Sequence, residues 1–108
     1  MEFVGTGLEN WDVSGVTDIR YTFSNAYKFN GDISNWDISQ ANNMIYTFQD
    51  ATAFNSDISK WNTAKMVRLS SAFNGATSFN ADLSKWDVSK VTLFSNVFDD
   101  TSALSDCT

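Results

Sequence analysis

The chain has 108 residues, of which 43% are hydrophobic and 15% aromatic, enough for one small domain with an apolar core. Its 13 acidic and 7 basic residues give a net charge of −6. An acidic chain without clustered Lys or Arg excludes nucleic acid as an expected partner. No apolar stretch is long enough to insert across a membrane.

The residue types needed for most catalytic sites are missing. The chain has no histidine, which excludes a Ser-His-Asp triad, a Cys-His pair and a histidine metal site. The single cysteine, Cys107, cannot form an internal disulfide and is expected to be a free thiol. The five glycines are scattered and form no phosphate-binding loop. We therefore expect no enzymatic activity and no cofactor.

The first strong pattern along the chain is a 25-residue period. The four tryptophans are spaced 25 residues apart, at Trp11, Trp36, Trp61 and Trp86. A sequence similar to Ile-Ser-Asn-Trp-Asp-Ile-Ser, residues 33–39, surrounds each of them. A fixed period of about 20–50 residues is typical of stacked repeats. We predict a single solenoid domain over residues 1–108, a fragment of a longer repeat protein because it begins and ends in mid-repeat. The predicted repeats are approximately 8–32, 33–57, 58–82 and 83–107.

Two apolar spacings within one repeat predict two elements. Residues 35–39 alternate polar and apolar, which favours a half-buried strand with Trp36 facing the core. Met44, Phe48 and Ala51 follow at helical spacing, which predicts a short helix from Met44 to about Ala51. The predicted fold class is therefore an α/β repeat whose strands form a parallel sheet, one strand and one short helix per coil.

Two long segments carry a resemblance to a known family. Residues 29–39 read Phe-Asn-Gly-Asp-Ile-Ser-Asn-Trp-Asp-Ile-Ser, and residues 79–92 read Phe-Asn-Ala-Asp-Leu-Ser-Lys-Trp-Asp-Val-Ser-Lys-Val-Thr. This pattern resembles the BspA-like leucine-rich repeat family, and within it the roughly 25-residue bacterial surface protein repeat. The resemblance covers roughly residues 4–104. It implies a right-handed leucine-rich-repeat-like solenoid in an extracellular or cell-surface protein that acts in adhesion or protein recognition.

The aromatic columns are expected to form the core. A row of exposed tryptophans could instead stack against sugars, but Trp36 shares its predicted strand face with apolar Ile38, which favours an inward position. Phenylalanines recur at the same period and are predicted to be core for the same reason. These phenylalanines are Phe23, Phe48, Phe73 and Phe98, and Phe29, Phe54 and Phe79.

The polar residues beside each tryptophan are the predicted recognition surface. They alternate with the core positions and should face solvent, and we expect them to bind a protein partner. The predicted partner-binding residues are Asp12, Asn35, Asp37, Lys60, Asn62, Lys85 and Asp87. A structural spacer without a ligand is one alternative. A carbohydrate-binding module using Tyr21, Tyr46 and Tyr27 is another.

A recurring Asn-x-Asp motif places Asp32, Asp57 and Asp82 in one column. Stacked coils would bring these carboxylates close together, and like charges need compensation. Each carboxylate could accept backbone N–H bonds in its own turn, which we favour, or calcium could bridge successive coils.

The two ends of the chain look like half-coils, at residues 4–8 and 103–107. Open apolar ends and unpaired backbone groups favour association between chains. We therefore expect end-to-end self-association.

Overall fold

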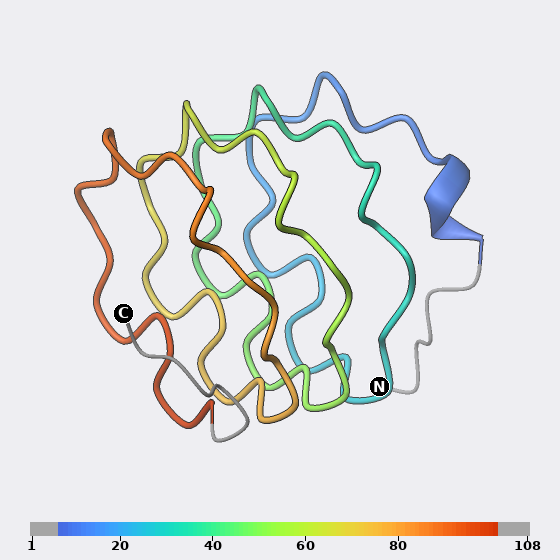
Figure 1. The fold of residues 1–108 in the computed structure, drawn as a ribbon. Helices are drawn as coiled ribbons and strands as arrows, with labels where there is room; N and C mark the ends of the chain where they lie inside the picture. The colour runs from blue at the N-terminus through green and yellow to red at the C-terminus, as the bar shows by residue number, and fades with distance from the viewer. Residues whose placement is uncertain (1–6, 102–108) are drawn as a thin grey trace.

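The computed structural model describes residues 7–101, in which successive coils of the chain lie side by side (Figure 1). The only helix in that range is the three-residue 3₁₀ helix η1 (Leu8–Asn10). The same range contains no strand, only single-residue parallel bridges that join Asp18, Asn43, Arg68 and Leu93 in succession. We number the coils 1 to 4 by residues 8–32, 33–57, 58–82 and 83–101.

Backbone hydrogen bonds connect each coil to the next at alternate residues. The Phe23 N–H donates to the Thr47 carbonyl at 2.9 Å, and the Phe48 N–H donates to the Ala72 carbonyl at 2.8 Å. Most donors in these segments belong to the earlier coil and their acceptors to the later coil, whereas Arg68 and Leu93, at the start of their segments, donate back to the preceding coil. We call these stretches the ladder segments: residues 18–25, 43–50, 68–75 and 93–100.

Most of the other N–H groups of the ladder segments close tight turns within their own coil. The Thr47 N–H donates to the Met44 carbonyl, and the Ala51 N–H donates to the Phe48 carbonyl, both at 3.1 Å. Half of the backbone donors therefore hold the coil in shape while the other half join it to its neighbour. This division satisfies the polar backbone without a regular helix or sheet.

Two positions in each ladder segment take the left-handed backbone conformation, which side chains other than glycine rarely adopt. A left-handed residue interrupts right-handed winding, so the segment runs forward instead of continuing as a helix. The first position is Tyr21, Tyr46, Ser71 and Asn96, with φ between 56° and 62°. The second is Asn25, Asp50, Gly75 and Asp100, with φ of 61°, 57°, 78° and 59°.

Two columns of stacked phenyl rings fill the space inside the coils. Rings of the first column, Phe23, Phe48, Phe73 and Phe98, stack with centroids 5.5, 5.3 and 5.7 Å apart. Rings of the second column, Phe29, Phe54 and Phe79, stack at 5.7 and 5.8 Å. The predicted phenylalanine core is confirmed for every member except Phe98 in coil 4, which is 42% exposed.

The predicted fold class is wrong. An α/β leucine-rich-repeat-like solenoid needs a strand and a helix in each coil, and residues 7–101 contain neither a strand nor a helix longer than η1. The radius of gyration is 12.6 Å, close to the roughly 13 Å expected of a globular domain of about 100 residues. The molecule is thus a compact globule of stacked irregular coils.

Each missing element has a physical reason. The predicted helix from Met44 to Ala51 does not form because the N–H groups of Met44 and Phe48 donate to the following coil, and Tyr46 is left-handed. The predicted strand at 35–39 does not form because no backbone hydrogen bond from these residues reaches another described coil. The helix-like spacing of the apolar residues comes instead from successive tight turns, each closed by a hydrogen bond between residues three apart.

Candidate functional site

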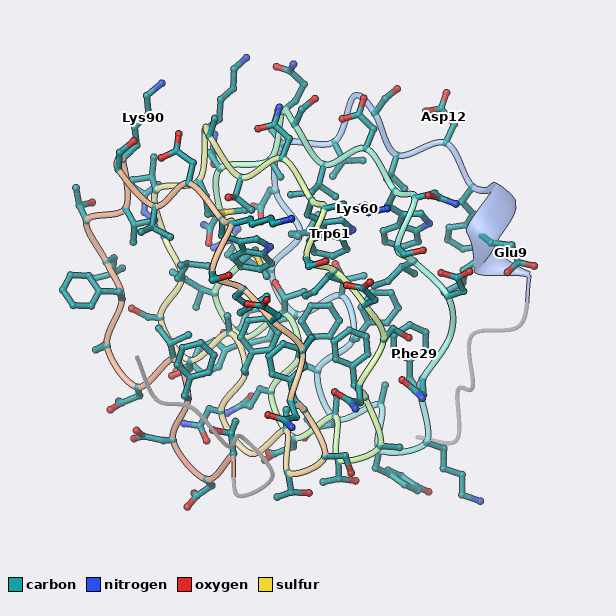
Figure 2. All side chains as sticks on the ribbon, viewed as in Figure 1. Glu9, Asp12, Phe29, Lys60, Trp61 and Lys90 are labelled. Carbon is teal, nitrogen blue, oxygen red and sulfur yellow. The ribbon has the colours of Figure 1, made fainter. Side chains whose placement is uncertain are left out.

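The candidate site lies beside the tryptophan column. Trp36, Trp61 and Trp86 are buried, which confirms the predicted inward position for three of the four tryptophans, whereas Trp11 in coil 1 is 62% exposed. Figure 2 shows Trp61 among the stacked aromatic side chains and Asp12 projecting from the edge of the molecule. The predicted partner-binding residues are all exposed, and we call them the Trp-flanking row: Asp12, Asn35, Asp37, Lys60, Asn62, Lys85 and Asp87.

Each buried tryptophan also fixes its coil to the preceding one. The Trp36 Nε1–H donates to the Leu8 carbonyl at 2.9 Å, and the Trp61 Nε1–H donates to the Ile33 carbonyl at 3.0 Å. Trp86 repeats the bond, to the Ile58 carbonyl at 2.9 Å. These bonds hold the backbone of the Trp-flanking row at a constant spacing. Sequence reasoning placed the rings in the core but missed the bonds, although a buried indole N–H usually has a partner.

The acidic members of the row and Asn62 cap tight turns. Asp12 Oδ1 accepts the Ser14 N–H at 3.0 Å, and Asn62 Oδ1 accepts the Ala64 N–H at 3.1 Å. Asp37 and Asp87 make the same bond, to the N–H groups two residues further on, at 3.0 and 2.9 Å. One oxygen of each of these four side chains is thus occupied by its own turn, and the side chain is held in a defined position at the surface.

The Asn-x-Asp column forms a second set of such caps. Asp32 Oδ1 accepts the N–H of Ser34 at 3.1 Å, and Asp57 and Asp82 accept the equivalent serine N–H groups at 3.0 and 2.9 Å. The favoured interpretation, turn caps, is therefore confirmed. Residues 7–101 contain no group of three or more His, Cys, Asp or Glu residues that could hold a metal ion, so the calcium alternative gains no support there.

The asparagines of the same motif have a role that the sequence did not reveal. Asn30 Oδ1 accepts the Asn55 N–H, and Asn55 Oδ1 accepts the Asn80 N–H, both at 2.7 Å. The motif therefore combines a cap within one coil, made by Asp, with a bond between coils, made by Asn. The recurrence of Asn at a fixed period was the available signal, because a side-chain ladder needs the same residue in each coil.

Hydrogen bonding lowers the pKa of the capping carboxylates. The Ser34 and Ser59 hydroxyls are the main cause for Asp32 and Asp57, followed by the serine N–H groups. For Asp82 the backbone N–H of its serine is the main cause of the lowered pKa, and the neighbouring Asp57 charge opposes it. Within the Trp-flanking row, the pKa values of Asp12, Asp37 and Asp87 are lowered in the same way.

This has a consequence for acid stability. A carboxyl whose pKa is lower in the folded state stabilises the fold above its unfolded pKa, near 3.8, and this contribution is lost as the pH falls through the folded pKa. We expect the melting temperature to be level above about pH 5 and to fall below about pH 4. Asn keeps the oxygen that accepts the backbone N–H, as Asn62 does in its own turn, but it does not titrate. Thermal melts of the triple variant Asp32→Asn, Asp57→Asn, Asp82→Asn should therefore show a smaller acid-induced decrease. An identical decrease in both proteins would contradict this assignment.

The tyrosines predicted as a carbohydrate surface are only partly brought together. The rings of Tyr21 and Tyr46 stack with centroids 5.1 Å apart, and Tyr21 is exposed. Tyr27 is also exposed, but it has no ring contact with either of them. Two tyrosines thus form a small aromatic surface on the ladder segments of coils 1 and 2.

The fold and this row define a class: a small repeat protein whose stacked 25-residue coils present polar side chains at a fixed spacing. The family model described as "Mycoplasma protein of unknown function, DUF285" matches residues 1–107, and the chain belongs to this family. The resemblance to the BspA-like leucine-rich repeat family is therefore wrong. No curated protein and no solved structure matches the chain. No helix in residues 7–101 is long and apolar enough to cross a membrane.

Proposed function

We propose that this protein is a non-enzymatic binding module that recognises a protein partner through the Trp-flanking row. The observation that carries the proposal is the regular exposure of these side chains on a fixed framework. Trp61 Nε1 is bonded to the preceding coil, and its neighbours Lys60 and Asn62 are both exposed. Preorganised side chains lose little conformational entropy on binding, which favours recognition.

The charge of the row changes along the stack and gives the surface a direction. Coils 1 and 2 contribute Asp12, Asn35 and Asp37, whereas coils 3 and 4 contribute Lys60 and Lys85 beside Asn62 and Asp87. A partner with basic groups opposite the first part and acidic groups opposite the second would be oriented by this arrangement. A location outside the cell was implied only by the resemblance and stays a prediction.

Charge reversal tests the proposal on an array of purified proteins. We expect the double variant Lys60→Glu, Lys85→Glu to weaken binding to a retained protein by about tenfold or more, because both basic groups of the row are reversed. Lys28→Glu is the matched control, since Lys28 is an exposed lysine of coil 1 outside the row. Equal binding by both variants, or no retained protein, would overturn the proposal, and the second result would favour a structural spacer.

One observation favours carbohydrate binding as a second candidate. The stacked Tyr21 and Tyr46 rings offer an aromatic surface of the kind on which sugars pack. If this candidate is right, a glycan array retains the protein, and Tyr21→Ser abolishes the retention while Lys60→Glu leaves it unchanged. A blank glycan array would exclude it.

A further inference from the structure

The asparagine of the Asn-x-Asp motif is followed by a different residue in each coil. That residue is Gly31 in coil 1, Ser56 in coil 2 and Ala81 in coil 3. A backbone nitrogen that follows an asparagine can attack the side-chain amide carbon, because the two atoms belong to one short stretch of chain and close a small ring. Glycine favours this attack, since it has no Cβ to hinder the nitrogen or restrict the backbone. Coil 1 therefore carries the most reactive sequence of this column.

The backbone nitrogen after the asparagine makes no hydrogen bond. Among residues 7–101 the Gly31 N–H has no acceptor, and the same is true of the Ser56 and Ala81 N–H groups. Coils 2 and 3 have a described coil on both sides, so the free N–H is a property of this position and does not depend on the end of the stack. No hydrogen bond has to break before the Gly31 nitrogen turns towards the Asn30 side chain.

The side-chain carbonyl of Asn30 is polarised by coil 2. Its Oδ1 accepts the Asn55 N–H at 2.7 Å, and the Ser56 hydroxyl lies 3.2 Å from the same oxygen. This hydroxyl donates to the Gly31 carbonyl at 2.6 Å, which anchors both residues of the pair to coil 2. Negative charge develops on Oδ1 when a nucleophile adds to the amide carbon, and a donor already directed at that oxygen stabilises it. The Asn30 side chain is exposed and therefore open to water.

We propose that the Asn30–Gly31 pair is a site of spontaneous deamidation in the folded protein. The Gly31 nitrogen loses its proton to hydroxide and bonds to Cγ of Asn30. The bond from Cγ to Nδ2 then breaks, and the nitrogen leaves as ammonia with a proton taken from water. Water opens the resulting cyclic imide. Hydrolysis at Cγ gives aspartate, and hydrolysis at the main-chain carbonyl carbon gives isoaspartate, so the net reaction consumes only water and releases ammonia.

A second Asn-Gly pair shows how the fold controls this reaction. Asn74 precedes Gly75, but the Gly75 N–H donates to the Asp99 carbonyl at 2.8 Å as part of its ladder segment. Gly75 is also buried and left-handed, with φ of 78°. Its nitrogen has to leave the bond to coil 4 before hydroxide can remove the proton and before it can attack Asn74. The sequence marks both pairs equally, whereas the structure favours reaction at Asn30.

Deamidation changes the contact between coils 1 and 2. An aspartate at residue 30 keeps an oxygen that accepts the Asn55 N–H, but it adds a negative charge two residues from Asp32. An isoaspartate adds a carbon atom to the main chain, which displaces Gly31 and the turn capped by Asp32. Both products make coil 1 more acidic. This modification does not depend on the binding function proposed above.

Incubation of the full chain at mildly alkaline pH tests the proposal. Mass spectrometry of tryptic peptides locates each converted asparagine, and enzymatic methylation detects isoaspartate. In the folded protein we expect conversion at Asn30 to exceed conversion at Asn74 by about tenfold or more, because reaction at Asn74 requires local opening of the ladder. In guanidinium chloride the two pairs should convert at similar rates, since the fold no longer distinguishes them.

Gly31→Ala is the matched variant, because Ala81 occupies the same position in coil 3. It should slow conversion at Asn30, while Asn55 and Asn80, which share the column but do not precede glycine, should stay intact over the same period. Conversion at Asn74 as fast as at Asn30 in the folded protein would overturn the proposal. An intact Asn30 under conditions that convert the denatured chain would also overturn it, because the fold would then protect this pair as well.

Discussion

Replacing Phe48 with alanine should lower the free energy of unfolding by about 3–5 kcal/mol. Its ring is fully buried and stacks on Phe23 at 5.5 Å, on Phe73 at 5.3 Å and on Phe54 at 4.1 Å. Removing it leaves a cavity in a narrow core and breaks the ring column between coils 1 and 3. Small domains have only about 5–15 kcal/mol of stability, so a large part would be lost.

Urea denaturation followed by tryptophan fluorescence measures this effect, and Phe98→Ala is its matched control. Phe98 belongs to the same column but is partly exposed and stacks on Phe73 alone, at 5.7 Å. We expect Phe98→Ala to lower the free energy of unfolding by less than half as much as Phe48→Ala does. Equal losses would show that the phenyl column does not act as the central support of the stack.

The second large effect is expected at Gly75. Replacing it with alanine should lower the free energy of unfolding by about 2 kcal/mol or more. Gly75 has φ of 78°, a conformation that side chains disfavour, and an added Cβ would overlap the Asp50 carboxylate in the preceding coil. The Gly75 N–H also donates to the Asp99 carbonyl at 2.8 Å, so the residue cannot move without disturbing the bond to coil 4.

Two further variants separate the causes. Gly15→Ala should be close to neutral, because an added Cβ there has nothing within 4 Å. The double variant Asp50→Ala, Gly75→Ala removes the overlap but keeps the unfavourable backbone angle. In a double-mutant cycle it should recover part of the loss caused by Gly75→Ala. A full recovery would show that the backbone conformation has no cost, and no recovery would show that the carboxylate is not in the way.

Burial could be predicted from the sequence better than secondary structure. The alternation at Trp36 and Ile38 correctly separated buried from exposed positions, because burial depends on which side of the backbone a residue occupies. The spacing of Met44 and Phe48 indicated a helix, because consecutive turns closed by three-residue hydrogen bonds return side chains to one face at similar intervals. Apolar spacing does not tell whether N–H groups bond within the coil or to the next one.

The left-handed positions were partly visible in the sequence. The column Asn25, Asp50, Gly75 and Asp100 consists of residues that tolerate positive φ, and that composition was the available signal. Tyr21 and Tyr46 gave no such signal, because tyrosine rarely adopts this conformation and is held in it by the bonds of its ladder segment. The exposure of the Trp-flanking row followed from alternation, whereas the indole bonds that space it needed the three-dimensional structure.

The shared direction of most ladder bonds gives the stack an electrical polarity. Peptide dipoles that point the same way add up, as they do in an α-helix, with partial positive charge at the end that presents N–H groups. Here that end is coil 4, and it carries the carboxylates of Asp99 and Asp100. The carbonyl end is coil 1, where the Arg20 guanidinium lies 3.0 Å from Asp18. The Asp99 and Asp100 carboxylates thus offset the dipole at the coil 4 end, whereas at the coil 1 end the charge of Arg20 is already compensated by Asp18.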